Sequence, residues 1–373
     1  MPRLSDRDAE GVCAVSGQRP TLAAVAARAG VSPSTASLAF SGAGPVAQET
    51  RERVLAAARE LGYAGPDPLA RSLRQGRSGI VATLIGERLL YAFRDPVAVG
   101  LLDGLAEVLS SLDSGLLLIS GDATRTGPTP DQVARTPMDA VIFAMCGRDD
   151  DPLLDHFIGR GIPVVAVDGP HREDVAVLDV DDYGGSMALA RHLAELGHRR
   201  IATVTLPSRL DGHRGPMSDE RRAQVGFADV RQRLKAVEDV FGRVPVVETP
   251  TNIIEEGQQA AALLLAAPPA ERPTAIVAQS DLLAVGVIRA ALDSGLRVPD
   301  DLSVVGFDGI ETPWLDHYVL TTVEQPYVEK GRVAGRMVAE FLAGRRPDDV
   351  RLPIEVRIGT TTAPPAAAGT LAP

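Results

Sequence analysis

The sequence is poor in the features of secreted, membrane-spanning or disulfide-stabilised proteins. It has two cysteines in 373 residues, Cys13 and Cys146, too few for a disulfide framework, so a reducing cytosol is the simpler expectation. No uninterrupted apolar run approaches the roughly 18 residues of a membrane span. The N-terminal MPRLSDRDAEG is charged and lacks the apolar core of a secretory signal. These absences predict a cytoplasmic protein without a membrane partner.

Motifs of enzymes and metal sites are also lacking. The sequence contains no P-loop, no H-E-x-x-H and no paired-cysteine metal motif. Residues 184–188, GGSMA, only approach the nucleophile elbow G-x-S-x-G. Asp179, Asp181 and Asp182 could bind a cation, but a solvated loop is the favoured alternative. We therefore expect no catalytic residues, no metal and no cofactor.

The composition predicts an α/β protein of more than one domain. Hydrophobic residues make up 45% and aromatic residues only 4%, so Ala, Val and Leu supply most of the core. Domains usually hold about 50–250 residues, so two or three are expected.

The stretch 21–63 has the pattern of three short helices with a tight turn between the first two. Thr21 is a plausible N-cap and Gly30 a plausible C-terminal stop. Ser32 would cap the second helix, with Pro33 in its first turn. The third helix should run from about residue 48 to 61 and end at Gly62. This order is the one that places a second helix in the DNA major groove.

Charge is distributed unevenly along the chain. Residues 19–79 hold eight basic and four acidic side chains, a balance of +4 in a chain of net charge −11. A basic segment joined to an acidic remainder is typical of a phosphate-contacting domain. The alternative is a small three-helix core with no nucleic-acid role.

From residue 79 onward, apolar strand patterns alternate with helical patterns in two rounds. In the first round the strands are expected at 80–85, 116–120, 140–144 and 164–168, with helices near 96–112 and 152–160. In the second round the strands are expected at 201–205, 244–247, 275–278 and 303–307, with helices near 183–196, 221–237, 256–266 and 282–294. Such alternation predicts parallel sheets covered by helices. Two rounds predict two lobes with a ligand cleft between them, at the carboxyl ends of the strands.

Several motifs together resemble the LacI/GalR family of bacterial transcription regulators. They are TLAAVAARAGVSPSTAS, VAQETRERVLAAARELGY and PLARSLRQGRS in the first part, and LAELGHRRIA, AQSDLLAVGVIRAALDSGLRVPDDLSVVGFDG and LTTVEQP in the second. The resemblance implies a small all-α helix-turn-helix head and a two-lobed periplasmic-binding-protein-like core of parallel sheets flanked by helices.

The expected domains follow from both arguments. They are a disordered tail (1–18), a helix-turn-helix domain (19–63), a linker with a hinge helix (64–78), a ligand-binding and dimerisation core (79–360) and a C-terminal tail (361–373). Lobe 1 should comprise about 79–182 plus 324–342, and lobe 2 about 183–323 plus 343–360. The resemblance puts a serine cap where Ala47 stands, and the linker is one residue longer than usual.

The resemblance assigns DNA-contacting roles in the head and hinge. Operator-reading side chains match Pro33, Ser34 and Leu38, and leucine replaces the better-known arginine at the last position. Leu38 cannot bind guanine as arginine does, so it should touch a thymine methyl or pack inward. A leucine wedge in the minor groove matches Leu73, and the alternative is a flexible basic tether. The remaining DNA-contacting candidates are Thr21, Ser32, Thr35, Ser37, Arg51, Ala70, Arg71, Arg74 and Arg77, although local capping explains the hydroxyl side chains equally well.

The resemblance also assigns effector-binding residues in the cleft. Asp168 and Asp308 each follow a strand and match residues that bond ligand hydroxyl or amine groups. Ser280 stands where many members have asparagine. The ligand arginine matches Arg222, or else Arg221. Tyr91 and Phe93 could stack on a sugar face or belong to the core.

Together these features predict a homodimeric transcription regulator, by family habit a repressor. Its affinity for a double-stranded operator would be set by a small-molecule effector, most simply a sugar. The alternatives are a soluble sugar-binding module without a DNA-binding role and an α/β enzyme. The missing signal peptide and the basic head argue against the first, and the missing catalytic constellation argues against the second.

Overall fold

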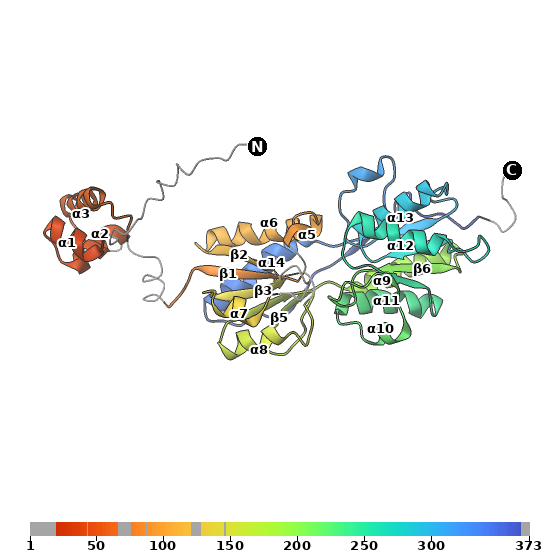
Figure 1. The fold of residues 1–373 in the computed structure, drawn as a ribbon, viewed down its shortest axis with the longest axis horizontal. Coiled ribbons are helices and arrows are strands. Elements are labelled where there is room, and N and C mark those ends of the chain that lie inside the picture. The colour runs from red at the N-terminus through yellow and green to blue at the C-terminus, as the bar shows by residue number, and fades with distance from the viewer. Residues whose placement is uncertain are drawn as a thin grey trace, which may run out of the picture. The chain divides into compact units, whose positions relative to one another are not determined.

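The computed structural model consists of two compact units, residues 1–78 and residues 79–373 (Figure 1). The residues that it describes are 20–42, 44–65, 76–86, 89–120, 128–144 and 147–366. The expected disordered tail, both cysteines and most of the expected hinge lie outside these ranges. No helix in the described ranges is long and apolar enough to cross a membrane.

The first unit is a bundle of three helices. They are α1 (Leu22–Ala29), α2 (Pro33–Ser41) and α3 (Gln48–Leu61). The Thr21 hydroxyl accepts the Ala24 N–H, and Gly30 ends α1 in the left-handed conformation at φ 67°. The expected helix boundaries and caps are therefore confirmed. The first turn of α3 has no side-chain cap at Ala47, as the sequence indicated.

Small side chains fill the core of this unit. Its fully buried members are Val25, Ala26, Ala36, Ala39, Val54, Ala57 and Ala58. Alanine lets the three helices approach closely but buries little apolar area per residue. Phe40 and Tyr63 meet edge to face, with ring centroids 5.5 Å apart, and close one end of the core.

Lobe 1 of the second unit is built on a six-stranded parallel sheet in the order β12-β5-β4-β3-β1-β2. Its strands are β1 (Ile80–Ile85), β2 (Gly115–Ser120), β3 (Ala140–Ala144), β4 (Val164–Val167), β5 (Ala176–Asp179) and β12 (Val350–Arg351). Its helices are α5 (Leu89–Ala92), α6 (Pro96–Ser111), α7 (Pro130–Ala134), α8 (Pro152–Gly159) and α14 (Tyr327–Leu342). The hydrophobic clusters place α6 and α14 on one face of the sheet, and α7 and α8 on the other.

Lobe 2 repeats this plan with a five-stranded sheet in the order β10-β9-β6-β8-β7. Its strands are β6 (Ile201–Thr205), β7 (Gly215–Pro216), β8 (Val246–Glu248), β9 (Ala275–Ala278) and β10 (Ser303–Val305). Its helices are α9 (Asp182–Glu195), α10 (Asp219–Ala223), α11 (Ala228–Phe241), α12 (Ile254–Leu265), α13 (Asp281–Asp293) and the 3₁₀ turn η1 (Pro313–Leu315). All its strand pairs are parallel except β7 with β8.

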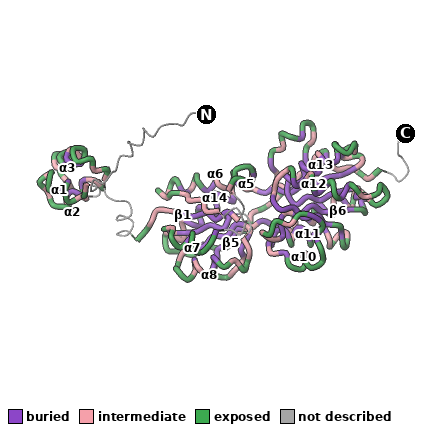
Figure 2. The backbone as a smooth tube through the Cα atoms, in the orientation of Figure 1, coloured by how far each residue is buried: buried purple, intermediate pink, exposed green. Residues whose placement is uncertain are grey.

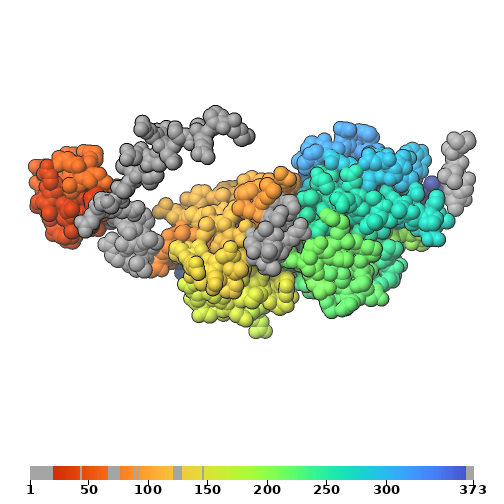
Figure 3. Space-filling model, viewed as in Figure 1, coloured from red at the N-terminus to blue at the C-terminus, as the bar shows by residue number. Residues whose placement is uncertain are grey.

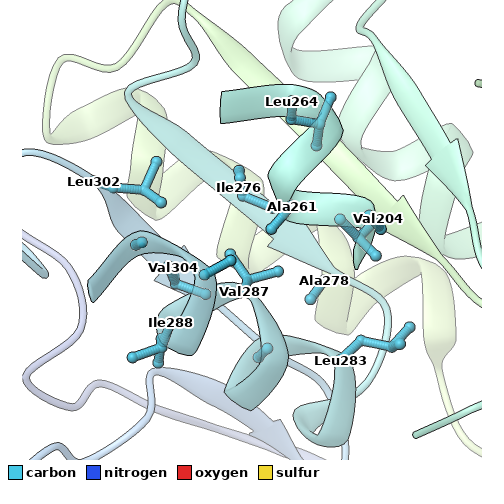
Figure 4. Close-up of a cluster of buried hydrophobic side chains, with 14 of the residues drawn as sticks. Val204, Ala261, Leu264, Ile276, Ala278, Leu283, Val287, Ile288, Leu302 and Val304 are labelled. Atoms are coloured by element: carbon cyan, nitrogen blue, oxygen red, sulfur yellow. The ribbon is translucent and has the colours of Figure 1, made fainter. Parts of the chain in front are cut away.

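Apolar side chains from both layers meet between α12, α13 and the sheet (Figure 4). Ile276 and Val304 come from neighbouring strands, and Val287 and Ile288 come from α13. Figure 2 shows the same division, with buried strands inside each lobe and exposed outer faces on the helices. In the space-filling view the lobes are two adjoining masses, orange to yellow and green to blue (Figure 3). The expected fold class is confirmed.

In the last part of the chain, two domain boundaries differ from those expected: the lobe assignment of residues 343–360 and the start of the C-terminal tail. β11 (Thr322–Glu324) pairs with β13 (Glu355–Arg357), and β12 between them pairs with β5 of lobe 1. The chain up to Arg351 therefore belongs to lobe 1, and the assignment of 343–360 to lobe 2 holds only after it. Thr361 is fully buried and donates to the Val304 carbonyl, so the C-terminal tail begins later than residue 361.

One expected helix is also interrupted. The stretch 221–237 was predicted as a single helix, but α10 and α11 are separated by residues 224–227. The Gly226 N–H bonds the Ser208 carbonyl in this break. Arg221 and Arg222 both lie within α10, before this break.

Candidate functional site

The second helix of the head presents a polar, exposed N-terminal turn. Ser32 caps α2 by accepting the Thr35 N–H at 3.1 Å, and its hydroxyl lies 2.8 Å from those of Ser34 and Thr35. Ser32, Pro33 and Ser34 are exposed, whereas Thr35 and Ser37 are half-buried. Capping thus occupies part of the hydrogen-bonding capacity that the sequence assigned to phosphates.

Leu38 stands on the same helix and is 40% exposed. Its side chain lies over Gly44, where an added Cβ would come within 3.0 Å of Leu38 Cδ2. Of the two alternatives for this residue, inward packing is only partial, so its outer surface can contact a thymine methyl. Arg51 belongs to the first turn of α3, and its guanidinium lies beside Gly42, which ends α2. Ala70, Arg71, Leu73 and Arg74 fall outside the described residues.

In the core, the two predicted strand-end carboxylates occupy equivalent positions. Asp168 follows β4 and Asp308 follows β10, each after a run of buried residues and each before a glycine. Both have positive φ, 59° and 135°, a conformation that is costly for a residue other than glycine. Such strain is tolerated when the surrounding contacts fix it, and it is frequent at functional sites.

Asp308 is held by amide donors. The Gln325 side-chain amide donates to it at 2.6 Å, and the Asp281 N–H lies 3.4 Å from its second oxygen. The side chain of Asp281 accepts from the N–H groups of Gly309 and Ile310 and from the Thr322 hydroxyl. Burial and the neighbouring Asp281 carboxylate raise the pKa of Asp308 well above its ordinary value.

Asp168 is instead paired with a lysine. The Lys330 ammonium lies 2.5 Å from Asp168 Oδ2, and only 1% of the lysine side chain is exposed. Burial raises the pKa of Asp168 to about 6, and the attraction of Lys330 opposes this rise. Lys330 was not among the predicted site residues.

A chain of hydrogen bonds crosses directly from lobe 1 to lobe 2. Asp95 caps α6 through the Val97 N–H and accepts from the Asn252 amide at 3.0 Å. The Ser280 hydroxyl donates to the Asn252 carbonyl oxygen at 2.5 Å and also caps α13. Burial raises the pKa of Asp95. Ser280 is thus a completely buried capping residue, one bond away from the interlobe contact.

The two candidate arginines diverge. Arg222 binds Glu238 and the Val244 carbonyl, within the layer of lobe 2 that contains α11. Arg221 binds Glu248 at the end of β8 and Asp211. Because Asp211 lines the cavity described next, Arg221 rather than Arg222 lies on the cleft side of the lobe. The structure thus places Arg221 nearer the cavity wall than Arg222, and which of the two binds a ligand stays a prediction.

A cavity of about 450 Å³ lies between the lobes. Lobe 1 contributes Phe143, Gly147 and Arg148 to its wall, and lobe 2 contributes Arg209, Asp211 and Phe227, among other residues. Asp168, Ser280 and Asp308 are not among the described residues of this wall. The Gly147 N–H bonds the Gly169 carbonyl, so one lining residue is bonded to the residue next to Asp168.

The other predicted residues have separate surroundings. Phe93 follows α5 and is 58% exposed, so it is not a core aromatic; the side chain of Tyr91 is not described. Asp181 caps α9, Asp182 pairs with Arg233 and Asp179 lies beside His171. These three aspartates are therefore not the solvated loop that the sequence favoured, and each has its own partner.

Known proteins share both units. Residues 21–65 match the bacterial regulatory proteins of the lacI family, and residues 190–362 match a periplasmic binding protein-like domain. An HTH-type transcriptional regulator of Mycolicibacterium smegmatis is 35% identical over 363 residues, which cover 94% of this chain and 98% of that regulator. The chain belongs to the lacI family. It is a DNA-binding transcriptional regulator with a helix-turn-helix head and a ligand-binding-protein-like core.

Solved structures of lacI-family proteins have the same fold. The complex of the regulator CelR with cellobiose has a TM-score of 0.62 and 26% identity, covering 92% of this chain and all of that one. The lac repressor dimer bound to operator has a TM-score of 0.72 at 22% identity, covering 93% of this chain and all of that one, and shows the common fold.

Four residues that bond the predicted site residues or join the lobes were not predicted from the sequence. They are Asp95, Asn252, Gln325 and Lys330. A usable signal existed for the lysine. Buried positions of α14 include 330, 334, 337 and 338, so Lys330 puts a charge in an apolar helical stripe. A charge at such a position needs a buried counter-charge. Asn252 offered no comparable signal, because it lies in a loop.

Proposed function

We propose that the protein is a homodimeric repressor whose affinity for a pseudo-palindromic operator is controlled by a sugar bound between the lobes. The observation that carries this proposal is the set of buried hydrogen-bonding side chains where the two lobes meet. Asp95 and Asp308 place buried carboxylate acceptors there, and Asp168, whose side chain is 11% exposed, adds a third. Carboxylates of this kind suit the hydroxyl donors of a sugar.

The same contacts suggest how a ligand would be sensed. Asp95 and Asn252 join the lobes directly, so a sugar that competes for their bonds or adds to them changes the free-energy difference between open and closed lobes. A ligand shifts such an equilibrium only by its differential affinity for the two states. The relative CelR was solved with cellobiose, which supports a sugar as the effector class.

Reading of the operator would rely on Ser34, Pro33 and Leu38, with phosphates bound by Arg51 and the hydroxyl groups of α2. Direct readout by Leu38 is limited to apolar contact, so DNA shape and deformability would carry more of the specificity. The hinge residues Arg71, Leu73 and Arg74 would add phosphate contacts and a minor-groove wedge beside Ala70.

Selection from a random double-stranded DNA pool tests the regulatory function. The full-length protein at a fixed, stated salt concentration should enrich a near-palindrome with a flexible pyrimidine–purine step at its centre. Ser34→Ala combined with Leu38→Ala should lose the enrichment, and Glu220→Ala, an exposed change in lobe 2, should keep it. Enrichment of no sequence by the parent protein would contradict the proposal.

The wedge role has its own test. Leu73→Ala should weaken binding to the enriched operator by about tenfold, the equivalent of 1–2 kcal/mol, while leaving sugar affinity unchanged. Fluorescence anisotropy with labelled operator measures the first quantity and calorimetry the second. Equal operator affinity in the variant and the parent would remove the wedge.

A further inference from the structure

The chain uses lysine twice and arginine 36 times. Lys235 is an ordinary surface residue on α11 with 62% of its side chain exposed. Lys330, the other lysine, has 1% exposed and is among the largest fully buried side chains. A compact ammonium with three rotatable donors fits a narrow buried site that a planar guanidinium does not. Position 330 therefore favours the small ammonium of lysine, whereas surface positions accept the larger guanidinium of arginine.

The bonds of Lys330 connect the two lobes' strand-end carboxylates. Its Nζ donates to Asp168 Oδ2 at 2.5 Å and to Gln325 Oε1 at 2.5 Å. The amide nitrogen of Gln325 then donates to Asp308 Oδ1 at 2.6 Å. Asp168 after β4 and Asp308 after β10 are thus linked through two side chains from the segment that crosses between the lobes.

At its lobe 1 end, this series of hydrogen bonds has a donor and an acceptor without partners among the described residues. An ammonium has three N–H donors, and two of those on Lys330 have partners among the described residues. Asp168 Oδ1 is buried and has no hydrogen-bond partner among the described residues. Buried polar atoms are nearly always bonded, so this end is suited to one further group. The Gly169 carbonyl next to it bonds Gly147 in the cavity wall.

The free donor and the free acceptor define the chemistry of that group. A hydroxyl donates one hydrogen bond and accepts others, so it can serve Asp168 Oδ1 and Lys330 Nζ together. An ammonium group could bond Asp168 Oδ1 but would be held against the Lys330 ammonium. A carboxylate or phosphate could bond Lys330 Nζ but would be held against the Asp168 carboxylate. A neutral hydroxyl meets neither repulsion, so like-charge contact at low dielectric disfavours both kinds of charged group.

We propose that Lys330 is a positioning residue of the effector site, which holds Asp168 and, through Gln325, Asp308, so that the site selects a neutral polyol through one hydroxyl bound between Asp168 and Lys330. This inference rests on the proposed function, because it specifies which ligands the interlobe site accepts. It adds to that function the rejection of amino sugars and sugar phosphates by a named pair of residues.

The scarcity of lysine makes the proposal directly measurable. Full-length protein labelled with ¹³C at lysine Cε should give two lysine signals, and Lys235→Arg should remove one and so assign the other to Lys330. The probes are glucose and cellobiose as neutral sugars, with glucosamine and glucose 6-phosphate as charged counterparts. We expect a neutral sugar to shift the Lys330 signal saturably and to leave the Lys235 signal in place. The charged counterparts should bind at least tenfold more weakly.

Variants separate this role from a structural one. Lys330→Met alone leaves a buried unpaired carboxylate and can fail to fold, so the informative variant is the double change Lys330→Met with Asp168→Asn. It should remain folded by circular dichroism and lose at least tenfold in calorimetric affinity for the neutral sugar. Lys330→Arg tests whether charge alone suffices, and it should also lose affinity. Lys235→Arg should bind as the parent does.

Three results would overturn the proposal: parental sugar affinity in the double variant, equal binding of a charged counterpart, or no saturable shift of Lys330 with either neutral sugar. The last result would mean that the two atoms are served by ordered water. Operator selection is a separate measurement without sugar. An enriched operator together with an unmoved Lys330 signal would therefore refute the effector chemistry and leave the DNA-binding function intact.

Discussion

The two lobes have equivalent aspartates after a strand, but the groups that bind the two carboxylates differ. Each places an aspartate with positive φ after a buried strand, within three residues of its end, and before a glycine, in VVAVDG and VVGFDG. In lobe 2 Asp308 is surrounded by amide donors from Gln325 and the backbone. In lobe 1 Asp168 is paired with the ammonium of Lys330.

Two lobes of the same fold can therefore differ in the electrostatics around equivalent carboxylates. A carboxylate among neutral donors keeps its charge only at a high desolvation cost, whereas a carboxylate beside an ammonium is compensated in place. The lobe 1 end is therefore the one whose ionisation depends on a single side chain. Three changes test this difference between the lobes, and a fourth tests the head.

The largest effect on stability is expected from Lys330→Met. Removing one partner of a buried ion pair leaves Asp168 uncompensated and should cost about 3–5 kcal/mol of unfolding free energy. Urea unfolding of the core measures it, and failure of the variant to fold is the limiting case of the same loss. In lobe 2, Gln325→Leu removes neutral donors and should cost only about 1–3 kcal/mol. A smaller loss for Lys330→Met than for Gln325→Leu would reverse the proposed difference between the lobes.

The contact between the lobes should respond to Asn252→Ala. This change removes the bonds to Asp95 and Ser280 and should cost about 1–2 kcal/mol of unfolding free energy. It should also enlarge the radius of gyration of the effector-free protein in small-angle scattering, because the closed state loses a direct bond. Gln258→Ala, which removes a surface bond to Asp293 within lobe 2, is the matched control. An unchanged radius would show that other contacts hold the lobes.

Acidification should stabilise the core slightly. Burial raises the pKa of both Asp168 and Asp281 to about 6, above their ordinary value of 3.8. The folded state therefore binds protons more tightly than the unfolded state, and stability rises as pH falls through 6. Between pH 7.5 and 5.5 the gain should be on the order of 1 kcal/mol. Asp211, whose pKa is lowered to about 2, loses its contribution only at more acidic pH.

Thermal melting across this pH range tests the sign. Asp168→Asn should remove only part of the gain, because the raised pKa values of Asp95, Asp281 and Asp308 remain. His171, whose pKa is raised by Asp179, contributes in the same direction and is unaffected by that variant. A melting temperature that falls steadily from pH 7.5 to 5.5 would contradict the assignment.

The smallest effect is expected in the head. Ala47→Ser supplies the missing side-chain cap of α3 and should stabilise the helical unit by about 0.5–1 kcal/mol. Ala56→Ser, inside the same helix, should be neutral or slightly destabilising. Circular dichroism of the head's melting transition distinguishes them. Equal shifts for both variants would mean that α3 begins elsewhere.

Periodicity and capping predicted the architecture well because both are local. Thr21, Gly30 and Ser32 set the helix ends of the head, and continuous apolar runs marked the main strands. Strand β12 was not predicted because two residues are too few to show an alternating pattern. Its pairing with β5 joins residues more than 170 positions apart in the sequence. The break between α10 and α11 was not predicted because it is fixed by a backbone bond from the Gly226 N–H to the Ser208 carbonyl, which local propensity does not reveal.

The site was harder to predict for a related reason. Asp168 and Asp308 follow strands, so their position at the carboxyl ends of the sheets could be predicted from the sequence alone. The choice between Arg221 and Arg222 depends on where α10 ends, and a shift of one residue turns a helical side chain by about 100°. Lys330 was visible as a charge in an apolar stripe, but its partner lies 162 residues away.

The most direct test of the account is an operator titration by fluorescence anisotropy with and without a neutral sugar that binds the core in calorimetry. In the parent protein the sugar should change operator affinity at least tenfold at fixed salt. In Asp308→Ala, which should keep its fold and its sugar-free operator affinity, the sugar should have no effect; Asp300→Ala, an exposed change, should respond like the parent. Identical operator curves for the parent with and without a bound sugar would contradict the claim that the interlobe site controls DNA binding.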